Sequence, residues 1–279
     1  MKKAFLLAGA AALILLGTGC QKLKSRDQLN KGVQAFKSAK YDEAIEHFKT
    51  SVDLDPTNPN ARLFLATSYF VQYIPGANSP ENLAYATKAR DEFTRVLSQN
   101  PNDKTALQYL ASLSYQEATG ESDLEAKLKK LDDARDWYIK LSQVDPKNKE
   151  AWYSLGVIDW LKWYPRWMAA LNKQGMKPDE EMPFKDKKIK AELASQYGGL
   201  IDDGIQNLQR ALQIDPQYDE AMAYMNLLIR ERASLADSMD QCKKDIASAN
   251  DWVQKSLEAK KIKASKQLGP QGITAEASK

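Results

Sequence analysis

The stretch from Gly32 to Pro56, GVQAFKSAKYDEAIEHFKTSVDLDP, is the unit that the rest of the chain repeats. It carries two apolar stripes, separated by a short polar stretch at residues 38–40. The stripes are Leu29, Gly32, Val33 and Phe36, followed by Ala44, Ile45, Phe48 and Val52. Both follow the spacing that gathers apolar side chains on one face of a helix. The stretch therefore predicts an amphipathic helical hairpin.

The same spacing recurs along the chain. Counted from a small residue in the second helix, an apolar residue follows at +4 and a proline at +12. The four sets are Ala44, Phe48, Pro56; Ala89, Phe93, Pro101; Ala134, Tyr138, Pro146; and Gly204, Leu208, Pro216. Small residues let two helices approach closely, and proline ends a helix because it lacks an N–H and clashes with the preceding turn. The pattern predicts stacked hairpins.

This signature resembles the tetratricopeptide repeat family, whose unit is a helix–turn–helix. Trp152, Leu155 and Gly156, preceded by Asp145 and Pro146, match the family's first helix most closely. The resemblance covers residues 26–261. It implies an all-α fold, a right-handed α-α superhelix of about five helical hairpins, and leaves the function open because fold and activity are separable.

The fourth hairpin carries a helical and loop insert at about residues 160–200, in which Trp160, Trp163 and Trp167 recur at helical spacing. We expect the helix to kink or stop near Pro165, because proline breaks the helical hydrogen-bond pattern. A polar loop is expected at residues 177–183, and the glycines at 198 and 199 allow a further break. Two roles remain open for the tryptophans: filling the inside of the superhelix, or binding a ligand.

The N-terminus has the layout of an export signal, with Lys2 and Lys3 before the apolar run of residues 4–16. The small residues before Cys20 resemble the lipobox of bacterial lipoproteins, although Gly17 stands where that motif usually has leucine. The resemblance implies a signal peptide at 1–19, a lipidated Cys20 with a tether at 20–26, and a lipid anchor on the periplasmic side of the cell envelope. By analogy, Gln21 favours the outer membrane. Plain secretion is the alternative.

We expect the repeat solenoid to span residues 27–262 and a disordered tail to span 263–279, because that tail has little to bury. Without residues 1–19 the chain has 38 basic and 37 acidic residues, since two of its 40 basic residues are Lys2 and Lys3. This balance predicts no nucleic-acid partner. The two cysteines, Cys20 and Cys242, leave no internal disulfide if the first is lipidated.

The sequence contains no Gly-rich phosphate loop, GxSxG, HExxH or CxxC motif. The single histidine, His47, has no cluster of metal-ligand residues around it in the sequence. We therefore expect no cofactor, no metal, no catalytic residues and no enzyme activity.

The candidate binding residues lie on the first helix of each hairpin, four residues after its small residue. They are Phe36, Phe70, Tyr115, Trp160 and Arg230, with Tyr109, Tyr153 and Tyr224 near the same side. In the tetratricopeptide family this face lines a concave groove that receives partner segments, and aromatic and arginine side chains carry much of the energy at interfaces. The alternative is that these rings pack as core, with groove exposure favoured for Tyr109 and Tyr115.

The sequence predicts a non-enzymatic scaffold that is anchored by lipid in a bacterial envelope and binds a segment of another envelope protein. Two alternatives belong to other classes. One is a periplasmic binder of a lipid, glycan or other small molecule that uses the tryptophan-rich insert. The other is a structural envelope protein that self-associates through its repeats.

Overall fold

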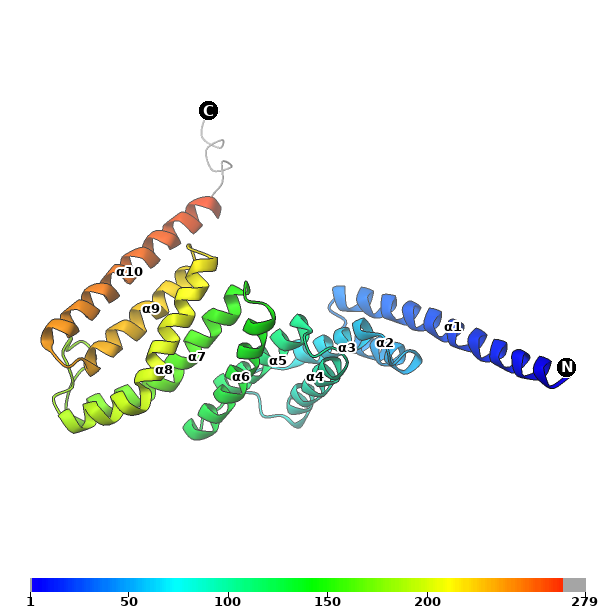
Figure 1. Ribbon diagram of the computed structural model, residues 1–279, viewed down its shortest axis with the longest axis horizontal. Coiled ribbons are helices and arrows are strands. Elements are labelled where there is room, and N and C mark those ends of the chain that lie inside the picture. The colour runs from blue at the N-terminus through cyan, green and yellow to red at the C-terminus, as the bar shows by residue number, and fades with distance from the viewer. Residues whose placement is uncertain (1, 268–279) are drawn as a thin grey trace, which may run out of the picture. The chain divides into compact units, whose positions relative to one another are not determined.

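The computed structural model describes residues 2–267, with side chains from Cys20 to Lys266. Every regular element in this range is a helix (Figure 1). The elements are α1 (Lys2–Lys37), α2 (Tyr41–Leu54), α3 (Pro59–Gln72), α4 (Pro80–Gln99), α5 (Lys104–Thr119), α6 (Leu124–Val144), α7 (Lys149–Lys173), α8 (Lys187–Ile214), α9 (Asp219–Arg232), the 3-10 turn η1 (Ala233–Leu235) and α10 (Met239–Gln267). The predicted all-α fold of paired helical hairpins is confirmed.

The chain divides into two compact units, residues 1–137 and 138–279, and the division falls within α6. In the first unit, α1 packs on α2, α3 packs on α4, and α2 packs on α3. The ring of Phe48 lies against the backbone of Gly32, so closely that a Cβ there would fall 2.5 Å from the ring. The same ring stacks on Phe64, with centroids 5.4 Å apart. This contact confirms that a small residue and a ring join neighbouring helices.

Side chains cap the starts of several helices. The side chain of Asn58 accepts hydrogen bonds from the backbone N–H groups of residues 60 and 61, and Pro59 takes the first helical position of α3. Ser79 caps α4 and Asp103 caps α5 in the same way. At α6 the cap is Asp123, whose Oδ1 accepts from the N–H of residue 126 at 2.8 Å.

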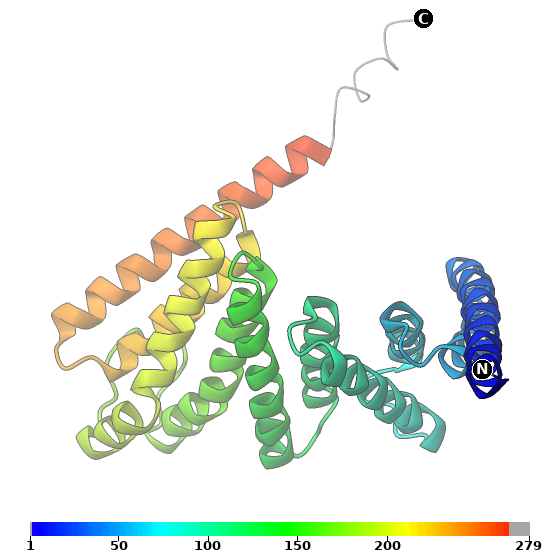
Figure 2. The ribbon, with the colours of Figure 1, turned by 45° about the vertical axis from the view of Figure 1, so that its right-hand side comes forward.

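The second unit contains α7, α8, α9 and α10, in which α7 packs on α8, α8 on α9 and α9 on α10 (Figure 2). Contrary to expectation, α7 continues through Pro165. A proline inside a helix costs about 3 kcal/mol. Trp163 and Trp167 beside it are buried, and each ring contributes roughly 4–6 kcal/mol by leaving water. Burial of this face therefore outweighs the local cost. Helix α8 likewise continues through the glycines at 198 and 199.

The loop between α7 and α8, residues 174–186, packs against η1. Phe184 is buried, and its N–H donates to the carbonyl of Ser234 at 2.8 Å. The indole N–H of Trp167 donates to the Ser234 hydroxyl at 3.0 Å. Of the two roles proposed for the insert, the structure shows the packing role for Trp163, Trp167 and the loop.

The ends of the folded region differ from the expected boundaries. The tether expected at 20–26 is part of α1, where the buried Ser25 and Ser51 each donate a hydrogen bond to the other's carbonyl at 2.8 Å. At the other end, α10 extends beyond residue 262, because Lys263 pairs with Asp219 and Glu220 at 3.3 and 3.2 Å. The rest of the expected tail, 268–279, and the side chains of the expected signal peptide lie outside the described residues.

No helix within the described residues is both long enough and apolar enough to span a membrane.

Candidate functional site

The candidate groove residues of the first unit are half-buried. Phe70 and Tyr109 meet edge to face with centroids 5.0 Å apart, and Tyr109 stacks on Phe93 at 5.1 Å. Tyr109 therefore packs between helices, which limits the groove exposure expected for it. Phe36 contacts Tyr41 of its own hairpin, 5.3 Å away.

The second unit brings three other candidates together in a continuous line of rings, which we call the aromatic row. Each ring contacts the next, with successive centroid distances of 4.9, 5.8, 5.3, 4.9 and 6.0 Å. In order, the aromatic row is Tyr218, Tyr153, Tyr224, Trp160, Tyr164 and Trp167. Helix α7 supplies four of these rings, while Tyr224 comes from α9 and Tyr218 precedes α9.

Sequence reasoning found Tyr153, Trp160 and Tyr224 of the row as binding candidates and missed the other three. Tyr164 and Trp167 carried a signal, because they follow Trp160 at +4 and +7 on the same helix. Tyr218 lies at the N-cap position of α9, outside the repeat positions used for the prediction.

The two ends of the aromatic row are buried and its middle is accessible. Tyr218 and Trp167 are 8% and 7% exposed, whereas Tyr164 is 37% exposed. The intervening rings of Tyr153, Trp160 and Tyr224 are half-buried. A partner could therefore reach the middle rings without unfolding the core that fixes them.

A buried carboxyl group holds the central ring in place. The indole N–H of Trp160 donates to Glu231 Oε1 at 2.9 Å. Glu231 is 3% exposed, and this burial raises its pKa to about 8, although the indole N–H groups of Trp160 and Trp163 act in the opposite direction. The group is therefore mostly protonated at neutral pH.

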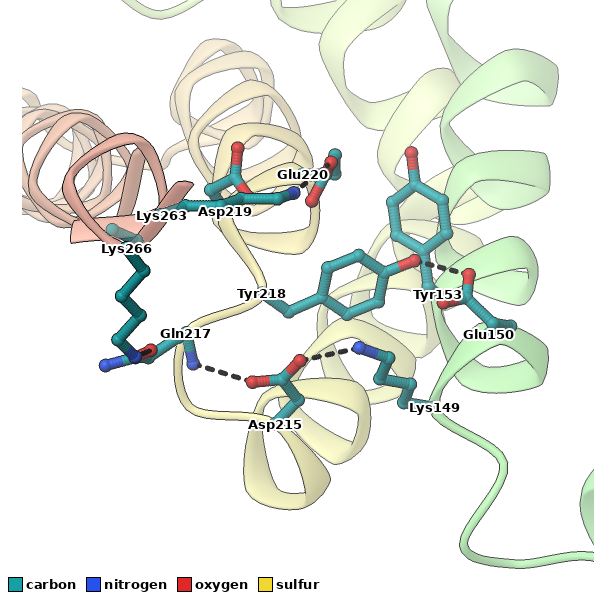
Figure 3. Close-up of a pocket in the computed structure, with 11 residues that line it drawn as sticks. Lys149, Glu150, Tyr153, Asp215, Gln217, Tyr218, Asp219, Glu220, Lys263 and Lys266 are labelled. Carbon is teal, nitrogen blue, oxygen red and sulfur yellow. Dashed lines mark hydrogen bonds and ion pairs between the residues drawn. The ribbon is translucent and has the colours of Figure 1, made fainter. Parts of the chain in front are cut away.

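A cavity of 670 Å³ adjoins one end of the aromatic row (Figure 3). Tyr153 and Tyr218 belong to both features, and the remaining lining is mainly charged. The full lining is Lys149, Glu150, Tyr153, Asp215, Gln217, Tyr218, Asp219, Glu220, Ala259, Lys263 and Lys266. An apolar row that continues into a polar cavity can bind a chain whose residues change from apolar to polar.

The charges of this cavity are paired with one another. Lys149 lies 2.6 Å from Asp215, which raises the pKa of the lysine and lowers that of the carboxyl group. The Tyr218 hydroxyl donates to Glu150 at 2.5 Å, and burial together with this carboxylate raises the pKa of the tyrosine. Lys263 spans Asp219 and Glu220, as described above. The lining is therefore close to neutral.

Arg230, the last candidate, lies in a clamp between elements. Its guanidinium pairs with Glu181 of the α7–α8 loop and donates to Asn250 of α10 at 2.5 Å and to Asn226 at 3.2 Å. These bonds hold α9, α10 and the loop together, so the Arg230 side chain has a structural role.

Within residues 20–266 no group of three His, Cys, Asp or Glu side chains is arranged to hold a metal ion. His47 Nδ1 lies 2.7 Å from the amide oxygen of Gln28. Cys20 is exposed, and Cys242 is buried with its Sγ 3.6 Å from the Glu181 carbonyl oxygen.

Residues 28–58 match the family model for the tetratricopeptide repeat. RNA polymerase II-associated protein 3 of Rattus norvegicus is 33% identical over 130 residues, which are 46% of this chain and 16% of that protein, so this chain spans a small part of its relative. A structure of MamA is 14% identical with a TM-score of 0.52, covering 87% of this chain and 94% of that one. A structure described as the first TPR of Spaghetti (RPAP3) bound to the HSP90 peptide SRMEEVD is 25% identical with a TM-score of 0.34, covering 47% of this chain and 86% of that one.

The likeness to MamA at this identity shows a shared fold. The match at residues 28–58 identifies the repeat from which that fold is built, and the hairpins α1–α2, α3–α4, α7–α8 and α9–α10 follow the same plan. Residues 28–58 therefore form a tetratricopeptide repeat, and the chain as a whole shares the fold of MamA.

Proposed function

We propose that this protein is an interaction scaffold whose aromatic row binds a segment of a partner protein. The observation that carries the proposal is the continuity of the row: six rings in successive contact, accessible in the middle and anchored at both ends. Rigid aromatic side chains lose little conformational entropy on binding, and they dominate interface energies.

The cavity beside the row specifies the kind of segment. Apolar side chains of the partner would contact Tyr153, Tyr224 and Tyr164. Residues at one end of the segment would enter the cavity. Its lining contains both lysines and carboxylates, which suits polar partner side chains and partner side chains of either charge. We therefore propose a segment with apolar anchors followed by a polar, mixed-charge end.

A non-enzymatic role is part of the proposal. General acid or base catalysis needs a group that is free to exchange a proton with a substrate. Each carboxylate of the cavity is instead engaged by a neighbouring side chain. Asp215 forms an ion pair with Lys149, and Glu150 accepts a hydrogen bond from Tyr218. Asp219 and Glu220 both pair with Lys263. This arrangement favours binding over chemistry.

We further propose that the protein is attached to the periplasmic face of a bacterial envelope membrane through a lipid on Cys20. The basic and apolar run before this residue supports the proposal, and Cys20 is exposed on α1. We expect the wild-type protein to incorporate labelled palmitate and to fractionate with membranes. Cys20→Ala should abolish the label, and equal labelling of the two proteins would refute the lipid anchor.

Partner binding is tested by removing two accessible rings. We expect the double variant Tyr153→Ala, Tyr164→Ala to lose about 30-fold or more in affinity for a protein captured by the wild type, because one aromatic hot spot is worth about 2 kcal/mol. The measurement is quantitative capture from a detergent extract of the native envelope, followed by titration of the captured protein.

Tyr85→Ala is the matched control, because Tyr85 is also a half-buried ring but lies on α4 in the other unit. It should bind the partner as the wild type does. If the double variant folds, as circular dichroism would report, and still binds with wild-type affinity, the aromatic row is not the binding surface.

A further inference from the structure

A second pocket lies in the second unit, between the end of α8, the start of α9 and α10. Its volume is 470 Å³. We call it the apolar pocket, after the apolar part of its lining: Leu212, Met222, Trp252, Ala259 and Ile262. It contains no residue of the aromatic row and shares only Gln217 and Ala259 with the cavity described above. It is therefore a separate site from the one proposed for the partner segment.

The apolar pocket is open to solvent and has a neutral rim. Met222 is 6% exposed, whereas Trp252 and Ile262 are half-buried and present part of their apolar surface to water. The charged residues of the rim, Lys255 and Glu258, are exposed and of opposite sign. Apolar surface that faces water is stabilised when another apolar group covers it. The pocket therefore suits an uncharged, apolar side chain.

The end of α10 is held at the rim of this pocket. The ammonium group of Lys266 donates to the side-chain oxygen of Gln217, a residue of the pocket lining, at 2.9 Å (Figure 3). Lys263, three residues earlier, pairs with two carboxylates at the start of α9 at 3.3 and 3.2 Å. Residues 268–279, which lie outside the described part of the structure, follow this anchored turn directly in the sequence. The segment therefore starts beside the apolar pocket.

The length of the segment allows it to return to the pocket. A helix rises about 1.5 Å per residue, so Ile262 lies about 8 Å and Trp252 about 22 Å before Gln267 along α10. An extended chain covers about 3.3 Å per residue. Ile273 is the sixth residue after Gln267, so it reaches back as far as about 20 Å. This range includes most of the pocket between Ile262 and Trp252.

The residue types of the segment match the pocket. Residues 268–275, LGPQGITA, carry no charge, although the last turns of α10 are rich in lysine. Gly269 and Pro270 disfavour continuation of the helix and are residue types that favour a turn of the chain. Beyond this turn, Ile273 is the only large apolar side chain. The segment thus offers one apolar group at a distance that reaches the pocket.

We propose that residues 268–279 fold back along α10 and place Ile273 in the apolar pocket, against Trp252. Because the segment is attached at the rim, its effective concentration at the pocket is on the order of millimolar, and a weak contact is enough to fill the site. The segment then acts as an internal ligand. An external apolar segment has to displace it before it can bind in this pocket.

Methyl NMR of the full chain, with carbon-13 in the δ1 methyl groups of isoleucine, tests the proposal. Ile273→Val removes one signal and so identifies that of Ile273. We expect this methyl group to show a nuclear Overhauser effect to the Trp252 indole. We also expect a ring-current shift away from its position in a synthetic peptide of residues 268–279. Trp252→Leu should return the signal to the peptide position, and dilution of the wild type should leave it unchanged.

Trp152→Leu is the matched control, because Trp152 is also a half-buried tryptophan of the second unit with a cation over its ring, Arg210 at 4.5 Å, but lies outside the pocket. It should leave the Ile273 signal where the wild type has it. A change in the segment itself avoids any effect on the helices. Ile273→Ser should shift the δ1 methyl signal of Ile262 in the pocket, and Thr274→Ser should not.

A wild-type Ile273 signal at the peptide position would overturn the proposal. So would an Ile273 signal that Trp252→Leu leaves unchanged, or an Ile262 signal that Ile273→Ser leaves unchanged. A ring-current shift that disappears on dilution would overturn it in favour of a second copy of the chain in the pocket. Loss of partner binding by the aromatic row would leave the Ile273 signal as it is, so the two proposals fail independently.

Discussion

Glu231→Gln should make this protein more stable at alkaline pH, by up to about 5 kcal/mol. Burial raises the pKa of Glu231 from 4.5 to about 8, so the folded protein binds this proton more tightly than the unfolded chain does. The contribution of this group is therefore fully favourable below pH 4.5 and is lost as the pH rises through 8. Glutamine keeps the shape and polarity of the protonated acid and has no proton to lose.

The measurement is urea unfolding of both proteins at intervals between pH 5 and pH 9. The wild-type free energy of unfolding should fall relative to that of Glu231→Gln across this range. Glu192→Gln, on the exposed face of α8, is the matched control and should run parallel to the wild type. Parallel curves for the wild type and Glu231→Gln would show that the carboxyl group is not held in an apolar environment.

Gly156→Ala should destabilise the protein by about 2 kcal/mol. A Cβ at this position would lie 2.5 Å from Leu208 Cγ and 3.0 Å from the carbonyl oxygen of Gly204. The leucine is fully buried, and the second neighbour is backbone, so neither can move aside cheaply. The substitution would force apart α7 and α8, the two helices of the fourth hairpin.

Gly198→Ala is the same chemical change on α8 in open space, because no atom lies within 4 Å of its Cβ position. It should stabilise the helix by about 1 kcal/mol, since alanine is the better helix former. Chemical denaturation followed by circular dichroism measures both variants. Equal effects at the two glycines would contradict the close approach of α7 and α8.

The repeat pattern predicted the fold well because it records packing between neighbours. A small residue such as Gly32 and a ring such as Phe48 meet in the structure as their spacing indicates. The break expected at Pro165 was wrong because proline's local tendency to end a helix is outweighed by the burial of Trp163 and Trp167 beside it. The ring spacing on α7 was visible in the sequence, but only the structure shows which rings are buried and which are accessible.

The cavity beside the aromatic row was harder to predict because its lining residues are distant in sequence. Lys149 begins α7 and Asp215 follows the end of α8, 66 residues later, and no spacing rule brings them together.

Site-specific photo-crosslinking in cells tests the central claim, binding of a partner segment by the aromatic row, most directly. A photoreactive phenylalanine analogue would replace Tyr164, the most exposed ring of the row, and in a parallel strain Tyr85. We expect a discrete adduct with a partner protein from position 164 and none from position 85. The absence of any adduct at 164, or the same adducts from both positions, would contradict the claim.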